Sequence, residues 1–141
     1  MKKILLVEDN LTTAKSYKAI LRTISKDIKV EVVVDADVAA KRIPKNDFDL
    51  LITDVNLKND KIDGFKLARL AYVAGKPVMI ITGSGIINRI RFYLMYHDMC
   101  ESTIYLHKPI NAELLRGQAK ELLNRKKIDP AKIFQTLIKD I

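Results

Sequence analysis

Short apolar runs alternate with longer segments of helical periodicity along the chain. Each run is rich in branched aliphatic residues and is bounded by polar or turn-forming residues, which is typical of buried strands in a parallel sheet. The runs predict five strands, at Lys2–Val7, Val30–Val34, Phe48–Thr53, Pro77–Ile81 and Thr103–Leu106.

A segment with apolar residues at helical spacing follows each predicted strand. Asn10, Asp35 and Asn111 stand where N-caps are expected, while Pro44 and Gly75 stand where helices are expected to stop. The predicted helices are Leu11–Ser25, Ala36–Ile43, Gly64–Ala74, Ile86–Tyr96 and a helix from residue 112 to about Lys126.

Strands that alternate with helices predict an α/β fold, here a three-layer, doubly wound, five-stranded parallel sheet with right-handed crossovers. Residues 1–126 are expected to form this domain. Residues 127–141 are expected to form a short C-terminal helical extension, in which Asp129 is the N-cap of the helix and Pro130 stands in its first turn. The extension packs on the body of the chain or serves as a docking or dimer helix. Its apolar stripe consists of Ile133, Phe134, Leu137, Ile138 and Ile141.

Composition narrows the class of protein. The chain has 141 residues, the size of one domain, and no apolar run long enough to span a bilayer. The amino terminus lacks the apolar core of a signal peptide. The single cysteine, Cys100, cannot form an internal disulfide. We therefore expect a cytoplasmic protein without membrane insertion.

The net charge of +8 is unevenly distributed, because the stretch from Gly64 to His97 contains Lys and Arg but no acid. Such a stretch forms either a positive face for an acidic protein or nucleic acid, or ordinary solvated helix faces, which we favour.

Polar residues stand at the predicted carboxyl ends of four strands: Glu8 and Asp9, Asp54, Thr82, and Lys108. The carboxyl ends of parallel strands meet at one edge of the sheet, where such folds bind ligands. Clustered carboxylates need a cation, and Mg²⁺ suits oxygen ligands. With a lysine and a hydroxyl opposite, the set predicts phosphoryl chemistry in which Asp54 can be the nucleophile.

These residues, together with three further features, occur in an order and at spacings shared with a known family. The matching features are Glu8-Asp9, Asp54, Gly64, Thr82, Tyr105 and Lys108-Pro109. From residue 2 to about residue 126 the chain resembles the receiver domain of two-component response regulators. The resemblance implies a flavodoxin-like sheet in the order 2-1-3-4-5.

The resemblance also implies roles for the matching residues. Asp54 would accept a phosphoryl group from a sensor histidine kinase, a phosphotransfer protein or a small phosphodonor. Asp9, Asp54 and the backbone carbonyl of Asn56 would bind Mg²⁺, with Glu8 acting directly or through water.

Lys108 would pair with the phosphoryl oxygens, and the Lys108-Pro109 peptide would be cis. Thr82 and Tyr105 would form a switch that changes the binding of a downstream protein partner. The chain would then be no enzyme beyond its self-catalysed phosphotransfer and dephosphorylation. Whether the chain forms a homodimer is left open by the resemblance.

The chain departs from the family pattern between Thr82 and Lys108. Gly83 replaces a common alanine, and Glu101-Ser102 replaces a common Gly-Ala pair. The stretch is also about four residues longer than usual, so its helix is expected to be shifted or irregular.

The sequence leaves two other functions open. An aspartyl phosphatase of the haloacid dehalogenase type would carry its nucleophile on the first strand and an acid at the position of Asn56. A receiver-fold interaction module would use the basic stretch without phosphorylation to bind an acidic protein or nucleic acid. We do not expect the chain to bind DNA directly.

Overall fold

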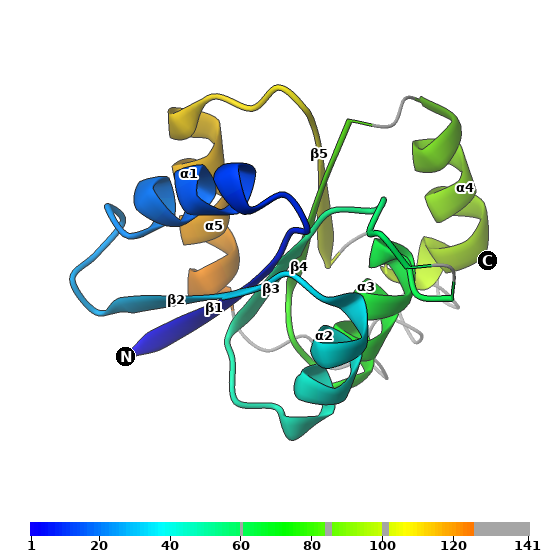
Figure 1. The fold of residues 1–141 in the computed structure, drawn as a ribbon, viewed down its shortest axis with the longest axis horizontal. Helices are drawn as coiled ribbons and strands as arrows, with labels where there is room; N and C mark the ends of the chain where they lie inside the picture. Colours follow the sequence, from blue (N-terminus) through cyan, green and yellow to red (C-terminus); the bar gives the residue numbers. More distant parts are fainter. Residues whose placement is uncertain (60, 84–85, 100–101, 126–141) are drawn as a thin grey trace, which may run out of the picture.

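The computed structural model describes all residues except 60, 84–85, 100–101 and 126–141. It contains a five-stranded sheet in the order β2-β1-β3-β4-β5, and every pair of neighbours is parallel (Figure 1). The predicted fold and strand order are therefore confirmed. The strands are β1 (Lys2–Val7), β2 (Ile28–Val33), β3 (Leu50–Thr53), β4 (Val78–Thr82) and β5 (Thr103–His107).

Two strands begin two residues away from their predicted starts because of partners distant in sequence, and all other strand ends match the prediction to within one residue. β2 begins at Ile28, two residues early, because Ile28 pairs with Lys2 of β1. β3 begins at Leu50 rather than Phe48. The preceding residue, Asp49, exchanges hydrogen bonds with Lys3: its side chain accepts from the Lys3 amide at 2.8 Å, and its own amide donates to the Lys3 carbonyl at 2.7 Å.

The helices fall where the periodicity predicted them, and the first turns of four of them are capped by the side chains of Asn10, Asp35, Asp63 and Asn111. α1 ends four residues before Ser25, because the Thr23 hydroxyl donates to the Ile20 carbonyl in a turn that follows the helix. The helices are α1 (Leu11–Leu21), α2 (Ala36–Arg42), α3 (Gly64–Val73), α4 (Ile86–Tyr96) and α5 (Ala112–Asn124). Short 3-10 turns, η1 (Ile43–Lys45) and η2 (His97–Met99), follow α2 and α4.

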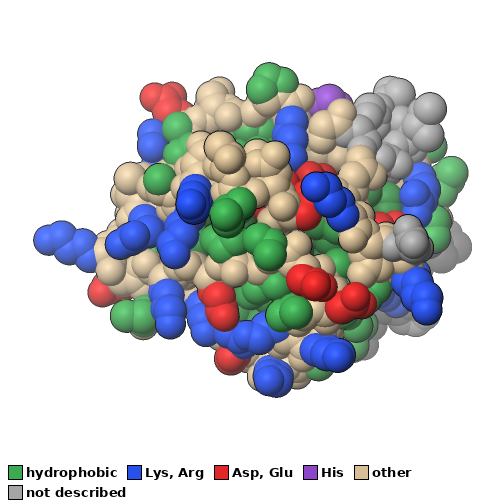
Figure 2. All heavy atoms as spheres, viewed as in Figure 1, with side chains coloured by type: hydrophobic (Ala, Val, Ile, Leu, Met, Phe, Trp, Pro, Cys, Tyr) green, Lys and Arg blue, Asp and Glu red, His purple; other side chains and the backbone are tan. Residues whose placement is uncertain are grey.

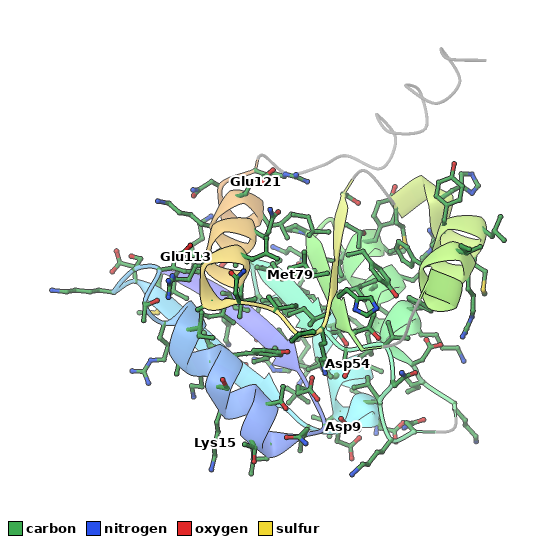
Figure 3. The ribbon with its side chains drawn as sticks, turned by 90° about the horizontal axis from the view of Figure 1, so that it is seen from above. Asp9, Lys15, Asp54, Met79, Glu113 and Glu121 are labelled. Atoms are coloured by element: carbon green, nitrogen blue, oxygen red, sulfur yellow. The ribbon has the colours of Figure 1, made fainter. Side chains whose placement is uncertain are left out.

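The helices form a layer on each face of the sheet (Figure 1). α1 and α5 cover one face, where Tyr17 and Leu115 pack in a core cluster with fully buried Met79 of β4 (Figure 3). α2, α3 and α4 cover the other face, where Phe65 and Phe92 are buried. The two clusters place β1, β3 and β4 at the centre of the molecule.

The expected irregularity between Thr82 and Lys108 is not seen within α4, which covers the predicted residues and is followed by η2. The predicted C-terminal helix lies outside the described residues. None of the described helices is both long enough and apolar enough to cross a membrane.

Candidate functional site

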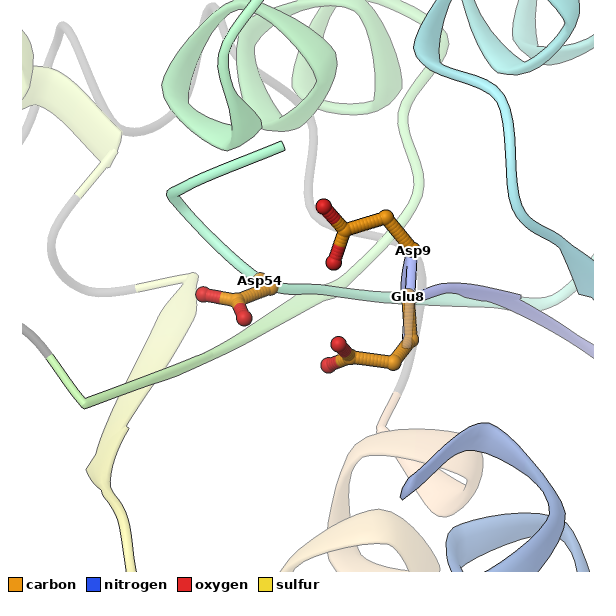
Figure 4. A group of neighbouring side chains, drawn as sticks. All are labelled: Glu8, Asp9 and Asp54. Carbon is orange, nitrogen blue, oxygen red and sulfur yellow. The ribbon is translucent and has the colours of Figure 1, made fainter. Parts of the chain in front are cut away.

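Three carboxylates meet at the carboxyl edge of the sheet. Glu8 and Asp9 follow β1, and Asp54 follows the neighbouring strand β3, whose Thr53 pairs with Val7. One oxygen of each carboxylate lies within 4.8 Å of the others. Figure 4 shows the three side chains reaching into the same space, and Figure 3 places Asp9 and Asp54 at the same end of the sheet.

The backbone of Asp54 is held on two sides. Its amide donates to the Val7 carbonyl at 3.2 Å. On the other side, the first residue of α3 comes so close that a Cβ on Gly64 would lie 1.9 Å from the Asp54 carbonyl oxygen. Only glycine allows this approach. Gly64 is thus required by packing beside the acid cluster.

Backbone amides also fix the carboxylate oxygens. The Asn10 amide donates to Glu8 Oε1 at 3.2 Å, and the Asn56 amide donates to Asp54 Oδ1 at 3.3 Å. The Lys58 amide donates to Asp9 Oδ2 at 3.1 Å. The loop after β3 therefore ties the Asp9 and Asp54 carboxylates to one surface.

Lys108 supplies a positive charge at the centre of the cluster. Its Nζ lies 2.8 Å from Asp54 Oδ2 and 3.3 Å from Glu8 Oε2. Its amide donates to the Thr82 carbonyl at 2.8 Å, which extends the β4–β5 ladder by one residue. The Lys108-Pro109 peptide is cis, as the sequence resemblance implied.

Burial and charge shift two pKa values in the cluster. Burial raises the pKa of Glu8, as does the charge of Asp54, while Lys108 opposes the shift. Burial alone would lower the pKa of Lys108, but its hydrogen bond to Asp54 and the charges of Asp54 and Glu8 outweigh burial and raise it. The cluster therefore favours a cation.

The residues present fit a magnesium ion. The three carboxylates offer hard oxygen ligands within reach of one another, and Glu8 and Asp54 are only 2% and 8% exposed. With Glu8 ionised, the three carboxylates carry three negative charges. Among the described residues, the one ammonium that pairs with Glu8 and Asp54 is that of Lys108. A divalent cation would balance the remaining charge. Glu8, Asp9 and Asp54 could hold it.

Thr82 and Tyr105, the two residues expected to form the switch, lie on different strands. Thr82 is fully buried at the end of β4, beside the backbone of Lys108. Tyr105 is half-buried on β5 and belongs to the α3–α4 side of the sheet, with its ring centroid 6.1 Å from that of Phe92. Tyr105 therefore packs against α4.

One residue near the site was missed in the sequence. Burial raises the pKa of the Tyr17 phenol, Lys108 opposes the shift, and the charges of Glu8 and Asp54 add to it. Tyr17 therefore lies within electrostatic reach of the cluster from α1. In the sequence it was only one of the apolar positions of a helical stripe, and no local signal distinguished it.

The basic stretch from Gly64 to His97 is partly neutralised by acids outside it. Arg91 pairs with Asp63 at 3.0 Å, and Arg69 pairs with Asp98. Figure 2 shows Lys and Arg side chains scattered over one face, with Asp and Glu among them. These observations favour solvated helix faces over a continuous nucleic-acid surface.

Comparisons with known proteins agree with this geometry. The family model for the response regulator receiver domain matches residues 4–120. The chain is 28% identical over 125 residues to the two-component response regulator ORR26 of Oryza sativa subsp. japonica. That match covers 88% of this chain and 20% of the rice protein, so the chain spans about a fifth of the length of this relative.

Solved structures give the same result. A CheY-like response regulator receiver domain protein from Methanospirillum hungatei JF-1 is 26% identical, with a TM-score of 0.72 over 88% of this chain and 94% of that chain. A response regulator receiver domain protein from Clostridium thermocellum is 25% identical, with a TM-score of 0.72 over 90% of this chain and 98% of that chain. The chain therefore belongs to the response regulator receiver domains, a family of phosphorylatable signalling switches that bind Mg²⁺ at an acidic pocket.

Proposed function

We propose that this chain accepts a phosphoryl group on Asp54 in a Mg²⁺-dependent reaction, with a histidine kinase or phosphotransfer protein as donor. The observation that carries the proposal is the position of Asp54. Its carboxylate lies beside two further acids and 2.8 Å from the ammonium of Lys108. A nucleophile, a cation and ligands for Mg²⁺ are thereby within reach of one phosphoryl group.

In this reaction a carboxylate oxygen of Asp54 attacks phosphorus, and the phosphorus–nitrogen bond of the donor phosphohistidine breaks. The imidazole leaves with a proton from solvent, and an acyl phosphate remains on Asp54. Lys108 neutralises a phosphoryl oxygen as charge redistributes. Bound Mg²⁺ would add positive charge and orient the phosphoryl oxygens. Glu8, Asp9 and Asp54 would hold that cation.

The resulting acyl phosphate is the input to a conformational switch. The buried Thr82 hydroxyl would turn toward the phosphoryl group, and Tyr105 would follow into the space beside β4. Tyr105 already contacts Phe92 of α4, so its movement would alter the α4 surface. A downstream protein partner would read that change.

The test is incubation with acetyl phosphate, with and without Mg²⁺, followed by intact-mass measurement. We expect a mass increase of one phosphoryl group that requires Mg²⁺ and is absent in Asp54→Asn. Asp27→Asn, at an exposed acid before β2, is the matched control and should be modified like the wild type. Equal modification of Asp54→Asn and wild type would disprove the proposal.

A further inference from the structure

An apolar groove crosses the outer surface formed by α2, α3 and α4. These helices lie next to one another on the same face of the sheet (Figure 1). The groove has a volume of about 330 Å³, and none of its lining residues belongs to the acid cluster. Its lining residues are Ala40, Ile62, Lys66, Arg69, Leu70 and Tyr96.

The floor of the groove is the edge of a hydrophobic core. Ala40, Ile62 and Tyr96 are partly buried and pack against the core cluster on this face. The Tyr96 ring lies 6.2 Å from Phe65 and 5.7 Å from Phe92, measured between centroids. The floor is therefore held in place, and a ligand that covers it would remove further apolar surface from water.

One wall of the groove has an ordered chemical pattern. Lys66, Arg69 and Leu70 line the groove, and Val73, which is not a lining residue, continues their spacing of i, i+3, i+4 and i+7 along the same side of α3. The basic pair comes first, and the apolar pair follows. Leu70 is 37% exposed and Val73 is 68% exposed, so this side is accessible. Arg69 is paired with Asp98, whereas the Lys66 ammonium donates to the Lys61 carbonyl and forms no ion pair with an acid among the described residues.

We propose that this groove binds an amphipathic helix of an acidic protein partner. The helix would place apolar side chains on the floor and against Leu70 and Val73, and carboxylates beside Lys66. This is the helix-in-groove mode of recognition, in which anchors repeat at about three and four residues. Charge complementarity selects the occupant: among the described residues the groove is lined by Lys66 and Arg69 and by no acid, Asp98 pairs only with Arg69 and leaves the charge of Lys66 available, and the chain carries a net charge of +8. The apolar floor provides no charged groups that would bind the phosphates of a nucleic acid.

The probe is a labelled synthetic helical peptide with three leucines on one face and two glutamates at one end. A twin peptide carries lysines in place of the glutamates. Fluorescence anisotropy measures binding of each peptide to the complete, unmodified chain. The docking proposal goes beyond the phosphoryl-acceptor proposal, and because no phosphodonor is present, either can fail without the other.

Two exposed positions test the wall, and each has a matched control on α5. Leu70→Ser removes an apolar anchor, and Leu114→Ser does the same at a leucine of similar exposure, 40% against 37%. Lys66→Glu reverses a rim charge, and Lys120→Glu reverses an exposed charge on α5. Glutamate at the third residue of α3 also suits a helix N-terminus, so Lys66→Glu should fold.

We expect the glutamate peptide to bind, and Leu70→Ser and Lys66→Glu each to weaken binding by about tenfold, while the controls leave it unchanged. The lysine peptide should not bind. Absence of binding, equal binding of the two peptides, or equal losses in the α5 controls would overturn the proposal.

Two other occupants would also overturn it. A dimer of the wild-type chain in sedimentation that Leu70→Ser dissociates would assign the groove to a second copy. Tighter peptide binding by Phe134→Ser than by wild type would assign it to the C-terminal segment of the same chain.

Discussion

Replacing Gly64 with alanine tests the contact that fixes Asp54. The added Cβ would lie 1.9 Å from the Asp54 carbonyl oxygen and 2.8 Å from the Val55 Cα. Ordinary non-bonded contacts are about 3.5–4.0 Å, so α3 and the end of β3 must separate by more than about 1 Å. Both obstacles are backbone atoms, and no side chain can rotate away to relieve the overlap.

The magnitude follows from three contributions. Overpacking of this kind costs about 1–3 kcal/mol, and separation also weakens the hydrogen bond from the Gly64 amide to the Val55 carbonyl, 2.9 Å long, worth about 1 kcal/mol. The better helix propensity of alanine returns up to about 1 kcal/mol. We expect Gly64→Ala to lower the free energy of unfolding by roughly 1–4 kcal/mol.

Gly117 provides the matched control for the same substitution. It lies within α5, and a Cβ there would meet no atom within 4 Å, so Gly117→Ala should raise the free energy of unfolding by about 0.5–1 kcal/mol. Urea denaturation of both variants at one pH gives the comparison. Equal stability of Gly64→Ala and wild type would refute the steric reasoning. A second readout is the rate of Asp54 phosphorylation, which should fall only in Gly64→Ala.

Two further predictions concern the charges of the cluster. Burial raises the pKa of Glu8 above its ordinary value of 4.5. The folded state therefore binds this proton more tightly than the unfolded state. As a result, the stability of the wild type falls as pH rises from about 4.5 through the folded-state pKa. Glu8→Gln should remove that loss, so its stability relative to wild type should increase between pH 4 and pH 7 in urea titrations; a difference independent of pH would contradict this. Lys108→Gln leaves Glu8 and Asp54 without their ammonium partner and should cost roughly 1–3 kcal/mol at neutral pH. The loss should be smaller when Glu8→Gln is added, and strictly additive effects in this double-mutant cycle would argue against the pairing.

Much of the fold was readable because its signals are local. β3 and β4 are buried throughout and appear as continuous apolar runs, and the caps Asn10 and Asn111 stand directly before their helices. The acid cluster was predictable because topology alone brings the strand ends together.

The remaining features depend on contacts between residues far apart in the chain. The start of β3 depends on Asp49 and Lys3, which are 46 residues apart, and the ion pair of Lys108 with Glu8 spans 100 residues. The position of Tyr17 near the cluster follows from how α1 packs on the sheet. Helical periodicity gives the buried side of a helix but not which polar group its residues approach.

The attachments of Asp54 make the site mechanically asymmetric. On the side of β1 and α3, the contacts of the Asp54 backbone are with other backbone atoms: its amide donates to the Val7 carbonyl, and its carbonyl lies against Gly64. Toward β5 the connection is the flexible side chain of Lys108. One side is therefore stiff and the other compliant. A force on the Asp54 carboxylate would displace the Lys108 side chain before it moved β1 or α3.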